Sequence, residues 1–355
     1  MSGRSWFSQG ELSVLGTGSA LPGAPVSNAE LIGKVRAFDP ALSARSAERL
    51  GARLGMGERH LSRTFAAAIE GPAPGMTNPE LGARALGSAL AEAGLAANDL
   101  GYLIGHTATP AQPLPGNIAA VADLIGYDGP HIELRQACTG FANALMIAFG
   151  LLANKDSAPI AIIGSEMGSV FFDPRVVSGD AAQRVNMMQM GDGAAAVILA
   201  APSAGLPTLS RAWFGTTGHG RAPGIEMRCG GSNAPSTGAS VAQFRQDFAA
   251  IGEAGPALFA ASAGAARHQG LRVEAADWIV PHQANGKMDT VMAELLGVGA
   301  ERIFVNAGRV GNTGSAAIWL ALAELRAGGL ARGAQVIALG AEATRYLHGG
   351  FSYVH

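Results

Sequence analysis

The sequence predicts an α/β protein with buried strands, and three features of the chain lead to this prediction. Short runs rich in β-branched residues alternate with longer alanine-rich runs of helical length, which is typical of α/β architectures. The 355 residues are 48% hydrophobic and 15% charged, enough to bury a large core. The 50 glycines form no low-complexity tract and instead separate the apolar runs, as turn residues do.

The individual elements follow from these runs in chain order. Strands are expected at residues 100–106, 160–164, 194–200, 277–280 and 335–340. Helices are expected at residues 79–94, 116–125, 140–153, 284–296 and 313–327. A stretch rich in Gly, Pro, Ser and Thr, residues 205–240, is expected to hold one strand and then irregular loops. It divides the chain into an N-terminal half, 1–204, and a C-terminal half, 205–355.

Composition and charge argue against several classes of protein. A formal net charge of −2 is unlike a dedicated nucleic-acid binder, which normally carries a basic stripe. The longest apolar run, residues 141–153, is too short to cross a bilayer, and residues 1–11 lack the apolar core of a signal peptide. Two cysteines make no disulfide framework, so we expect a cytoplasmic protein with a free thiol. The histidines show no metal-ligand spacing, and no metal is expected.

Cys138 is the first candidate for chemistry. In "ELRQACTGFANALMIAF" it lies just before an apolar run of helical length. At a helix N-terminus the unpaired N–H groups and the helix dipole favour a thiolate, the reactive form of cysteine. A buried cysteine that only packs is the alternative. Cys229 lies in a Gly/Ser/Pro loop without a motif, and we interpret it as incidental.

His282 and Asn312 hold comparable positions in the second half of the chain. His282 follows an expected strand, and strand ends are where α/β proteins place working side chains. The alternative is that it caps the next helix. Asn312 directly precedes another expected helix, where a plain N-cap is the alternative.

Together, Cys138, His282 and Asn312 supply what thiol-based acyl chemistry needs: a nucleophile, a partner for it, and donors for a developing oxyanion. The same order of residue types describes papain-like proteases, whose histidine follows the cysteine by about 130–150 residues, a spacing that this chain fits. The papain signature around the cysteine is absent, however, and Cys138 lies in mid-chain. A protease is therefore disfavoured.

At these residues the sequence resembles the thiolase superfamily, and within it the β-ketoacyl-ACP synthase III group. Six segments carry the resemblance, in the family's order and along nearly the whole chain. They are "GTGSALPGAPVSNAEL", "RLGMGERHL", "QACTGF" with Cys138, "GDGAAAVIL" with Asp192, "VPHQAN" with His282 and "GNTGSAA" with Asn312.

The resemblance implies a five-layered αβαβα fold of two similar halves, a homodimer, and a two-stage reaction. Cys138 takes an acyl group from acyl-CoA or an acyl carrier protein. A malonyl-type extender then loses carbon dioxide, and its enolate attacks the acyl-cysteine. His282 and Asn312 donate hydrogen bonds to the enolate oxygen, and the backbone N–H of Cys138 is a candidate donor to the acyl oxygen. No cofactor is implied beyond these substrates.

Three further residues correspond to family positions. Asn285 matches a position near the pantetheine arm, with a helix N-cap as the alternative. Arg53 matches an arginine near the CoA nucleotide, with a solvated surface arginine as the alternative. Asp192, between two glycines, is expected to be a turn residue and not a catalytic acid.

The sequence departs from the family at three places. Arg49 stands where relatives often have a tryptophan that stacks on the CoA adenine. The C-terminal loop "GAEATRYLHGG" has Glu342 and Thr344 near expected glycines, with Arg345 adjacent. Arg345 is expected either to bind a substrate carboxylate or to pair with Glu342. The loop at residues 111–116 lacks the aromatic residue that many relatives use to limit the acyl tunnel.

These departures favour a specialised condensing enzyme of fatty-acid or polyketide-type biosynthesis, with acyl-CoA or an acyl carrier protein as partner. The alternative is a non-condensing acyltransferase of the same fold, which moves the acyl group from Cys138 to an alcohol or amine. A third hypothesis is a non-catalytic partner subunit. Retention of Cys138, His282 and Asn312 together argues against it.

Overall fold

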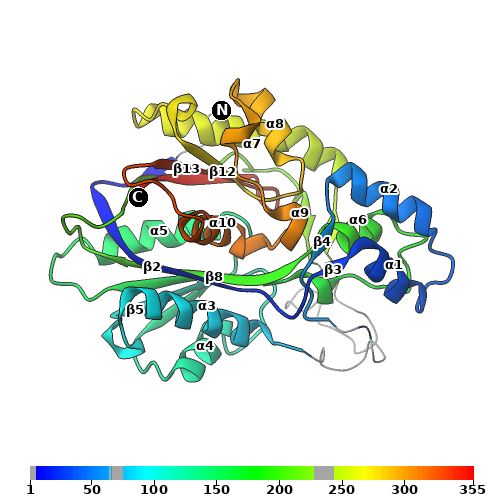
Figure 1. Ribbon diagram of the computed structural model, residues 1–355, viewed down its shortest axis with the longest axis horizontal. Coiled ribbons are helices and arrows are strands. Elements are labelled where there is room, and N and C mark those ends of the chain that lie inside the picture. The colour runs from blue at the N-terminus through cyan, green and yellow to red at the C-terminus, as the bar shows by residue number, and fades with distance from the viewer. Residues whose placement is uncertain (1–4, 64, 66–74, 228–243) are drawn as a thin grey trace.

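The computed structural model describes residues 5–63, 65, 75–227 and 244–355, and its elements are stacked in five layers (Figure 1). Helices form the two outer layers and the central one, and sheets lie between them, as the αβαβα expectation requires. The outer helices are α3 (Asn78–Ala93) and α4 (Asn117–Ile125) on one face, and α7 (Phe248–His268) and α8 (Met288–Leu296) on the other. The central helices are α5 (Gly140–Leu151) and α10 (Ala317–Ala327).

Nine strands are hydrogen-bonded in one continuous order that runs through both sheet layers. The four strands from the C-terminal half of the chain come first, and the five from the N-terminal half follow. The order is β12 (Trp278–Pro281), β13 (Gln335–Glu342), β14 (Leu347–Val354), β9 (Thr208–Thr216), β2 (Glu11–Ala20), β8 (Asp192–Ala200), β7 (Ile160–Met167), β5 (Tyr102–His106) and β6 (His131–Leu134). A tenth strand, β1 (Ser5–Phe7), pairs with β9. The two layers are joined where the start of β2 pairs with β9, while the rest of β2 pairs with β8.

The two central helices are locked together by aromatic side chains. Phe141 on α5 meets Trp319 on α10 edge to face, with ring centroids 5.9 Å apart. Trp319 in turn stacks on Phe351 of β14 at 5.2 Å. All three side chains are fully buried. Such packing fixes the N-terminal ends of α5 and α10, and the segments carrying Cys138 and Asn312 lie just before those ends.

Smaller elements gather on one side of the layers (Figure 1). They are β3 (Val26–Ser27), α1 (Asn28–Arg36), α2 (Ala44–Leu54), β4 (Glu58–Arg59), α6 (Ala181–Gln189) and α9 (Ala307–Val310). A short hairpin is formed by β10 (Ile225–Glu226) and β11 (Arg245–Gln246). Short 3-10 turns occur at Ala97–Asp99, Gly168–Phe171, Val273–Ala275, Ala300–Arg302 and Gly314–Ala316.

Every strand and helix that the sequence predicts is present, but two helices begin later than expected. The helix expected from residue 284 starts at Met288, which leaves 284–287 as a loop after His282. The helix expected from residue 313 becomes regular only at Ala317, after a 3-10 turn. The strand expected in the 205–240 stretch is β9. Within the ranges that the structure covers, no helix has the length and apolarity needed to cross a bilayer.

Candidate active site

Cys138 lies in the turn between β6 and α5, immediately before Thr139, the N-cap residue of α5. Its side chain is partly exposed and forms no disulfide. The first residue of α5, Gly140, packs closely against the ring of His106, since a Cβ at position 140 would lie 2.5 Å from Nδ1 of His106. Glycine at position 140 thus allows the buried His106 ring to pack beneath the turn.

The position at a helix N-terminus was expected to favour a thiolate, and the structure corrects this expectation. Burial raises the pKa of the Cys138 thiol well above its ordinary value, and the negative charges of Glu342 and Glu166 raise it further. The resting nucleophile is therefore a thiol at neutral pH, in spite of the helix dipole.

Glu342 ends β13 and reaches the turn from the other half of the chain. Its Oε2 accepts hydrogen bonds from the backbone N–H of Thr139 at 2.8 Å and from the Thr139 hydroxyl at 2.7 Å. Its Oε1 accepts from the hydroxyl of Thr344. The expected ion pair between Glu342 and Arg345 is wrong, because the carboxylate is buried against these donors while Arg345 is exposed.

His282 follows β12, and its backbone N–H donates to the carbonyl oxygen of Leu339 on β13 at 2.8 Å. The side chain is 4% exposed, and burial lowers its pKa to about 4. The ring is thus neutral near pH 7 and carries one N–H. Because α8 begins only at Met288, with Lys287 as its N-cap, the alternative that His282 caps this helix is wrong.

The loop that carries His282 is fixed by Gln283, a buried residue that the sequence analysis did not single out. Its Nε2 donates to the carbonyl oxygens of Pro281 and Phe304, at 2.8 and 3.0 Å. Its Oε1 accepts from the N–H of Asn306 at 2.9 Å. All three partners belong to the backbone, so Gln283 ties the His282 loop to the segment that leads into α9.

Asn312 is oriented by its own loop. Its Oδ1 accepts from the N–H of Gly314 at 3.0 Å, and its backbone N–H donates to the carbonyl oxygen of Gln189 at 2.9 Å. This bond closes a turn within the loop, but the N-cap residue of the 3-10 turn is Thr313 and that of α10 is Ala316, so the alternative that Asn312 is a plain N-cap is wrong. Since the amide oxygen is engaged there, the NH₂ group is the end of this side chain that remains to donate.

Glu166, at the end of β7, joins the loop after β5 to the loop of Asn312. Its Oε2 accepts from the N–H and the hydroxyl of Ser315, at 3.0 and 2.7 Å. Its Oε1 accepts from the N–H of Ala108 at 3.2 Å and from the hydroxyl of Thr109 at 2.5 Å. The carboxyl group is buried, and burial raises its pKa despite these four donors. No local pattern in the sequence marks Glu166, because its partner Ser315 lies far away in the chain.

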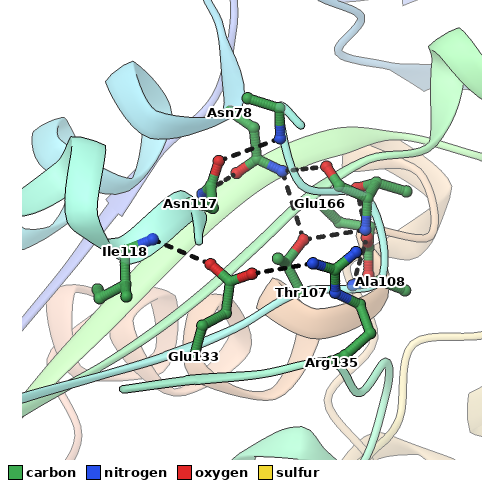
Figure 2. A network of polar contacts seen from close by, with 10 residues as sticks. Asn78, Thr107, Ala108, Asn117, Ile118, Glu133, Arg135 and Glu166 are labelled. Atoms are coloured by element: carbon green, nitrogen blue, oxygen red, sulfur yellow. Dashed lines mark hydrogen bonds and ion pairs between the residues drawn. The ribbon is translucent and has the colours of Figure 1, made fainter. Parts of the chain in front are cut away.

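The network around Glu166 extends to the starts of α3 and α4 (Figure 2). The amide of Asn78 donates to the carbonyl oxygen of Thr109 at 2.6 Å, and the amide of Asn117 donates to Asn78 at 3.0 Å. Glu133 on β6 accepts from the N–H of Ile118 at 2.9 Å. The loop that follows β5 is thus held at both of its ends.

Asp192 begins β8 and is not a turn residue, which corrects the expectation from the flanking glycines. Its buried carboxylate accepts from the N–H of Ser62 at 2.7 Å and from the N–H and hydroxyl of Ser169, at 2.9 and 2.5 Å. Burial raises its pKa to about 6. Gly191 is required for close approach, since a Cβ there would overlap the carbonyl oxygen of Val310 near Asn312.

Arg53 is exposed near the end of α2 and lines a surface hollow of about 450 Å³ between α2 and α6. Arg49 and Arg184 line the same hollow. Asn285 does not cap α8. Its Oδ1 accepts from the N–H of Lys287 at 2.9 Å, within the loop after His282. That loop touches the end of α2, where the N–H of Gly286 donates to the carbonyl oxygen of Leu54 at 2.9 Å. Cys229 lies outside the residues that the structure covers.

Contacts between their segments bring the three candidate catalytic residues to one region. Thr139, next to Cys138, bonds to Glu342 of β13, and three residues earlier on this strand Leu339 accepts from His282. The Ser315 hydroxyl, near Asn312, lies within hydrogen-bonding distance of Glu166 and of the carbonyl oxygen of Gln136. The region thus offers one thiol, a neutral imidazole and an amide whose NH₂ end remains to donate.

The models of one known family match the segments that carry these three residues. The model of 3-oxoacyl-[acyl-carrier-protein] synthase III matches residues 132–216, and that of its C-terminal part matches residues 266–349. The β-ketoacyl-[acyl-carrier-protein] synthase III of Rhodobacter capsulatus is 31% identical over 325 residues, which are 91% of this chain and 93% of that protein. The chain belongs to the β-ketoacyl-ACP synthase III family.

Solved structures agree with this assignment and confirm the predicted thiolase-like fold. The tetronic acid condensing enzyme AbyA1 superposes with a TM-score of 0.83 at 25% identity, covering 97% of this chain and 100% of that one. The 3-oxoacyl-ACP synthase III of Pseudomonas aeruginosa PAO1 gives 0.80 at 26% identity, covering 97% and 98%. Membership of this synthase family supports condensation of acyl thioesters as the general activity of the chain.

Proposed function

We propose that this protein is an acyl-thioester condensing enzyme that forms an acyl-cysteine on Cys138 and extends it with a malonyl-type thioester, in specialised fatty-acid or polyketide-type biosynthesis. The observation that carries the proposal is the pair formed by His282 and Asn312. The first is a buried neutral ring, and the second is an amide whose oxygen is already held by Gly314. Two N–H donors without positive charge suit the stabilisation of an enolate oxygen.

The reaction has two stages. First, the Cys138 sulfur attacks the donor thioester, its proton passes to the leaving thiol of CoA or of the carrier protein, and the acyl-cysteine remains. The backbone N–H of Cys138 is proposed to donate to the acyl oxygen at this stage. Second, the extender's carboxylate leaves as carbon dioxide, and the enolate carbon attacks the acyl-cysteine while His282 and Asn312 donate to the enolate oxygen. The bond between the acyl carbon and the cysteine sulfur then breaks, the 3-oxoacyl thioester is released, and the sulfur takes up a proton from water to restore the thiol.

The wild-type protein is expected to gain the mass of an acyl group from at least one member of a panel of acyl-CoAs and acyl carrier proteins. When loaded, it is expected to release labelled carbon dioxide from malonyl carrier protein and to form a 3-oxoacyl product. Intact-protein mass and label release measure the two stages separately. Loading without any release from a malonyl donor would contradict condensation and favour transfer to an alcohol or amine. No loading at all would contradict both functions.

We propose that the hollow between α2 and α6 receives the phosphates of CoA. Arg49, Arg53 and Arg184 line it, and the neighbouring loop of Asn285 is proposed to approach the pantetheine arm. Charge, in place of stacking on the adenine, would then hold the nucleotide, because Arg49 stands where relatives often have a tryptophan. Arg345 is exposed on the turn after β13, and contact with a substrate carboxylate stays a prediction for it.

Arg53→Glu is expected to raise KM for acyl-CoA about tenfold, which corresponds to the loss of one hydrogen bond to a charged group. It should leave loading from a short acyl-pantetheine thioester unchanged, because that donor has no nucleotide. Steady-state loading kinetics with both donors is the measurement. Arg45→Glu is the matched control, since Arg45 is exposed on α2 but does not line the hollow. An equal loss with both donors would contradict a nucleotide site.

We also propose that the boundary between the two halves of the chain lies at residue 204.

A homodimer is the other proposal about architecture, and the edge strand β6 supports it. On its outer side it has no partner strand within the part of the chain that the structure covers, and Ile132 on it is exposed. Leu114, at 85% exposure, and Leu124 are further large apolar side chains in solvent, on the loop before α4 and on α4 itself. An open edge beside exposed apolar side chains is suited to pairing with a second copy.

A further inference from the structure

Glu342 is a buried charge next to the nucleophile that the two-stage reaction does not use. It is 3% exposed, and three donors point at its carboxylate: the N–H and hydroxyl of Thr139 and the hydroxyl of Thr344. The backbone N–H and both hydroxyls donate to it, so the carboxylate acts as an acceptor in each of these contacts. Among the ion pairs of the covered residues none includes Glu342, so hydrogen bonds alone hold this charge.

The same contacts show what Glu342 does to the start of α5. Thr139 is the N-cap residue, yet its side chain makes no capping bond to the helix and donates to Glu342 instead. The first unpaired N–H of this end, that of Thr139, is taken by Glu342 as well. A carboxylate at a helix N-terminus offsets the positive end of the dipole, which would otherwise stabilise a thiolate on the preceding residue.

The hydroxyl of Thr139 also accepts from the amide of Gln136 at 3.0 Å, and the oxygen of that amide accepts from Asn143 at 2.9 Å. The turn from Gln136 to Asn143 is thus held by one chain of hydrogen bonds that ends on the carboxylate of Glu342. Position and charge at the turn therefore depend on the same side chain.

Among the described residues, the charges that act on the Cys138 thiol are those of Glu342 and Glu166, and no cation acts beside them. The titratable side chains at the turn include Glu342 on β13, Glu166 on β7 and His106 on β5. His282, after β12, is bonded through its backbone to β13, the strand that carries Glu342. Burial lowers the pKa of His106 to about 3 and that of His282 to about 4, so both rings are neutral. Arg135 is exposed and paired with Glu133.

We propose that Glu342 is a positioning residue of the nucleophile turn, which fixes the start of α5 across the two halves of the chain and favours the thiol form of Cys138 over the thiolate. This inference rests on the proposed function, because it takes Cys138 as the nucleophile. It assigns to Glu342, which stands near an expected glycine, an action on the reactivity of Cys138.

The test is the pH dependence of alkylation of Cys138 by iodoacetamide, followed by mass with peptide mapping to separate Cys138 from Cys229. In Glu342→Gln, which keeps the shape and removes the charge, the midpoint is expected to fall by about one pH unit. Below both midpoints the thiolate fraction then rises about tenfold. Alkylation rises only about three- to fourfold, because nucleophilicity falls with the thiol's pKa. Above both midpoints the variant should be slower than the wild type.

Two controls separate charge from structure. Glu342→Asp keeps the charge and is expected to keep a midpoint near that of the wild type. Glu92→Gln removes a carboxylate on α3 that bonds to Thr17 and Arg326, away from the turn, and should not move the midpoint. A merely loosened turn would speed alkylation at every pH without moving the midpoint.

Should Glu342→Gln not fold, the double variant Glu342→Gly/Thr139→Ala removes the charge together with its hydroxyl donor and serves the same measurement. An unmoved or raised midpoint in the folded variant overturns the proposal. Alkylation needs no substrate, so this outcome is distinct from a failure of the wild type to load acyl groups, which would contradict the proposed function instead.

Discussion

Cys138→Ala is expected to abolish acyl loading completely, while the wild-type protein gains the mass of one acyl group per chain. The reason is that alanine offers no nucleophile for the donor thioester, and among the described residues Cys138 is the free cysteine. Intact-protein mass after exposure to the preferred donor is the measurement. The melting temperature should stay close to that of the wild type, since Cys138 is partly exposed and its thiol makes no disulfide.

Cys229→Ala is the matched control for this variant, and it should load as the wild type does. If the Cys138→Ala protein still gained acyl mass while Cys229→Ala did not, the nucleophile would lie on the other cysteine. The assignment of the active site to the start of α5 would then be wrong.

His282→Ala and Asn312→Ala are each expected to lose decarboxylation of a malonyl extender about 100–1000-fold, because each removes one donor to the enolate oxygen. Loading of Cys138 should persist, since the enolate forms only in the second stage. Asn312→Asp sharpens the test. It keeps an oxygen that can accept from the N–H of Gly314 but has no NH₂ group, so the turn at Gly314 is retained while the donor to the enolate oxygen is lost.

Release of labelled carbon dioxide and acyl mass are to be measured on the same samples. His268→Ala is the control, because His268 is exposed at the end of α7 and lies against Phe7. Undiminished release in either variant would contradict the role given to that residue. Loss of loading together with release would instead point to a general role in shaping the site.

Local pattern was enough for the central part of the fold. The isoleucine-rich strand β7 is buried along its whole length, and the apolar run after Cys138 is buried mainly in its first half, at Gly140–Leu145; both are apolar enough to be recognised from the sequence. The sequence pattern did not predict α7, a helix of 21 residues, because this segment is rich in alanine and glycine and carries Pro256 in its interior. Packing against the sheet stabilises this helix where its own composition does not.

The candidate site divides in the same way. Cys138, His282 and Asn312 could be chosen because each follows or precedes a recognisable element. The residues that bond to their loops could not be predicted from local sequence, because Glu342 bonds to Thr139 and Glu166 bonds to Ser315 across the two halves of the chain. Local spacing suggested Arg345 as the partner of Glu342, and a residue from the other half holds the carboxylate instead. The thiolate expected from the helix dipole is not favoured mainly because burial raises the pKa of the Cys138 thiol, and the charges of Glu342 and Glu166 add to this.

The place of β2 in the sheet bears on how the chain is made. This strand precedes its partners β8 and β9 by a long stretch of chain, residues 21–191, all of which must be translated before either partner is available. Until then the strand that joins the two layers has an open edge on both sides. Pairings of such high sequence separation form slowly, because a long loop must close before any contact rewards it. The nascent N-terminal segment is therefore a natural client for chaperones that shield unpaired strands.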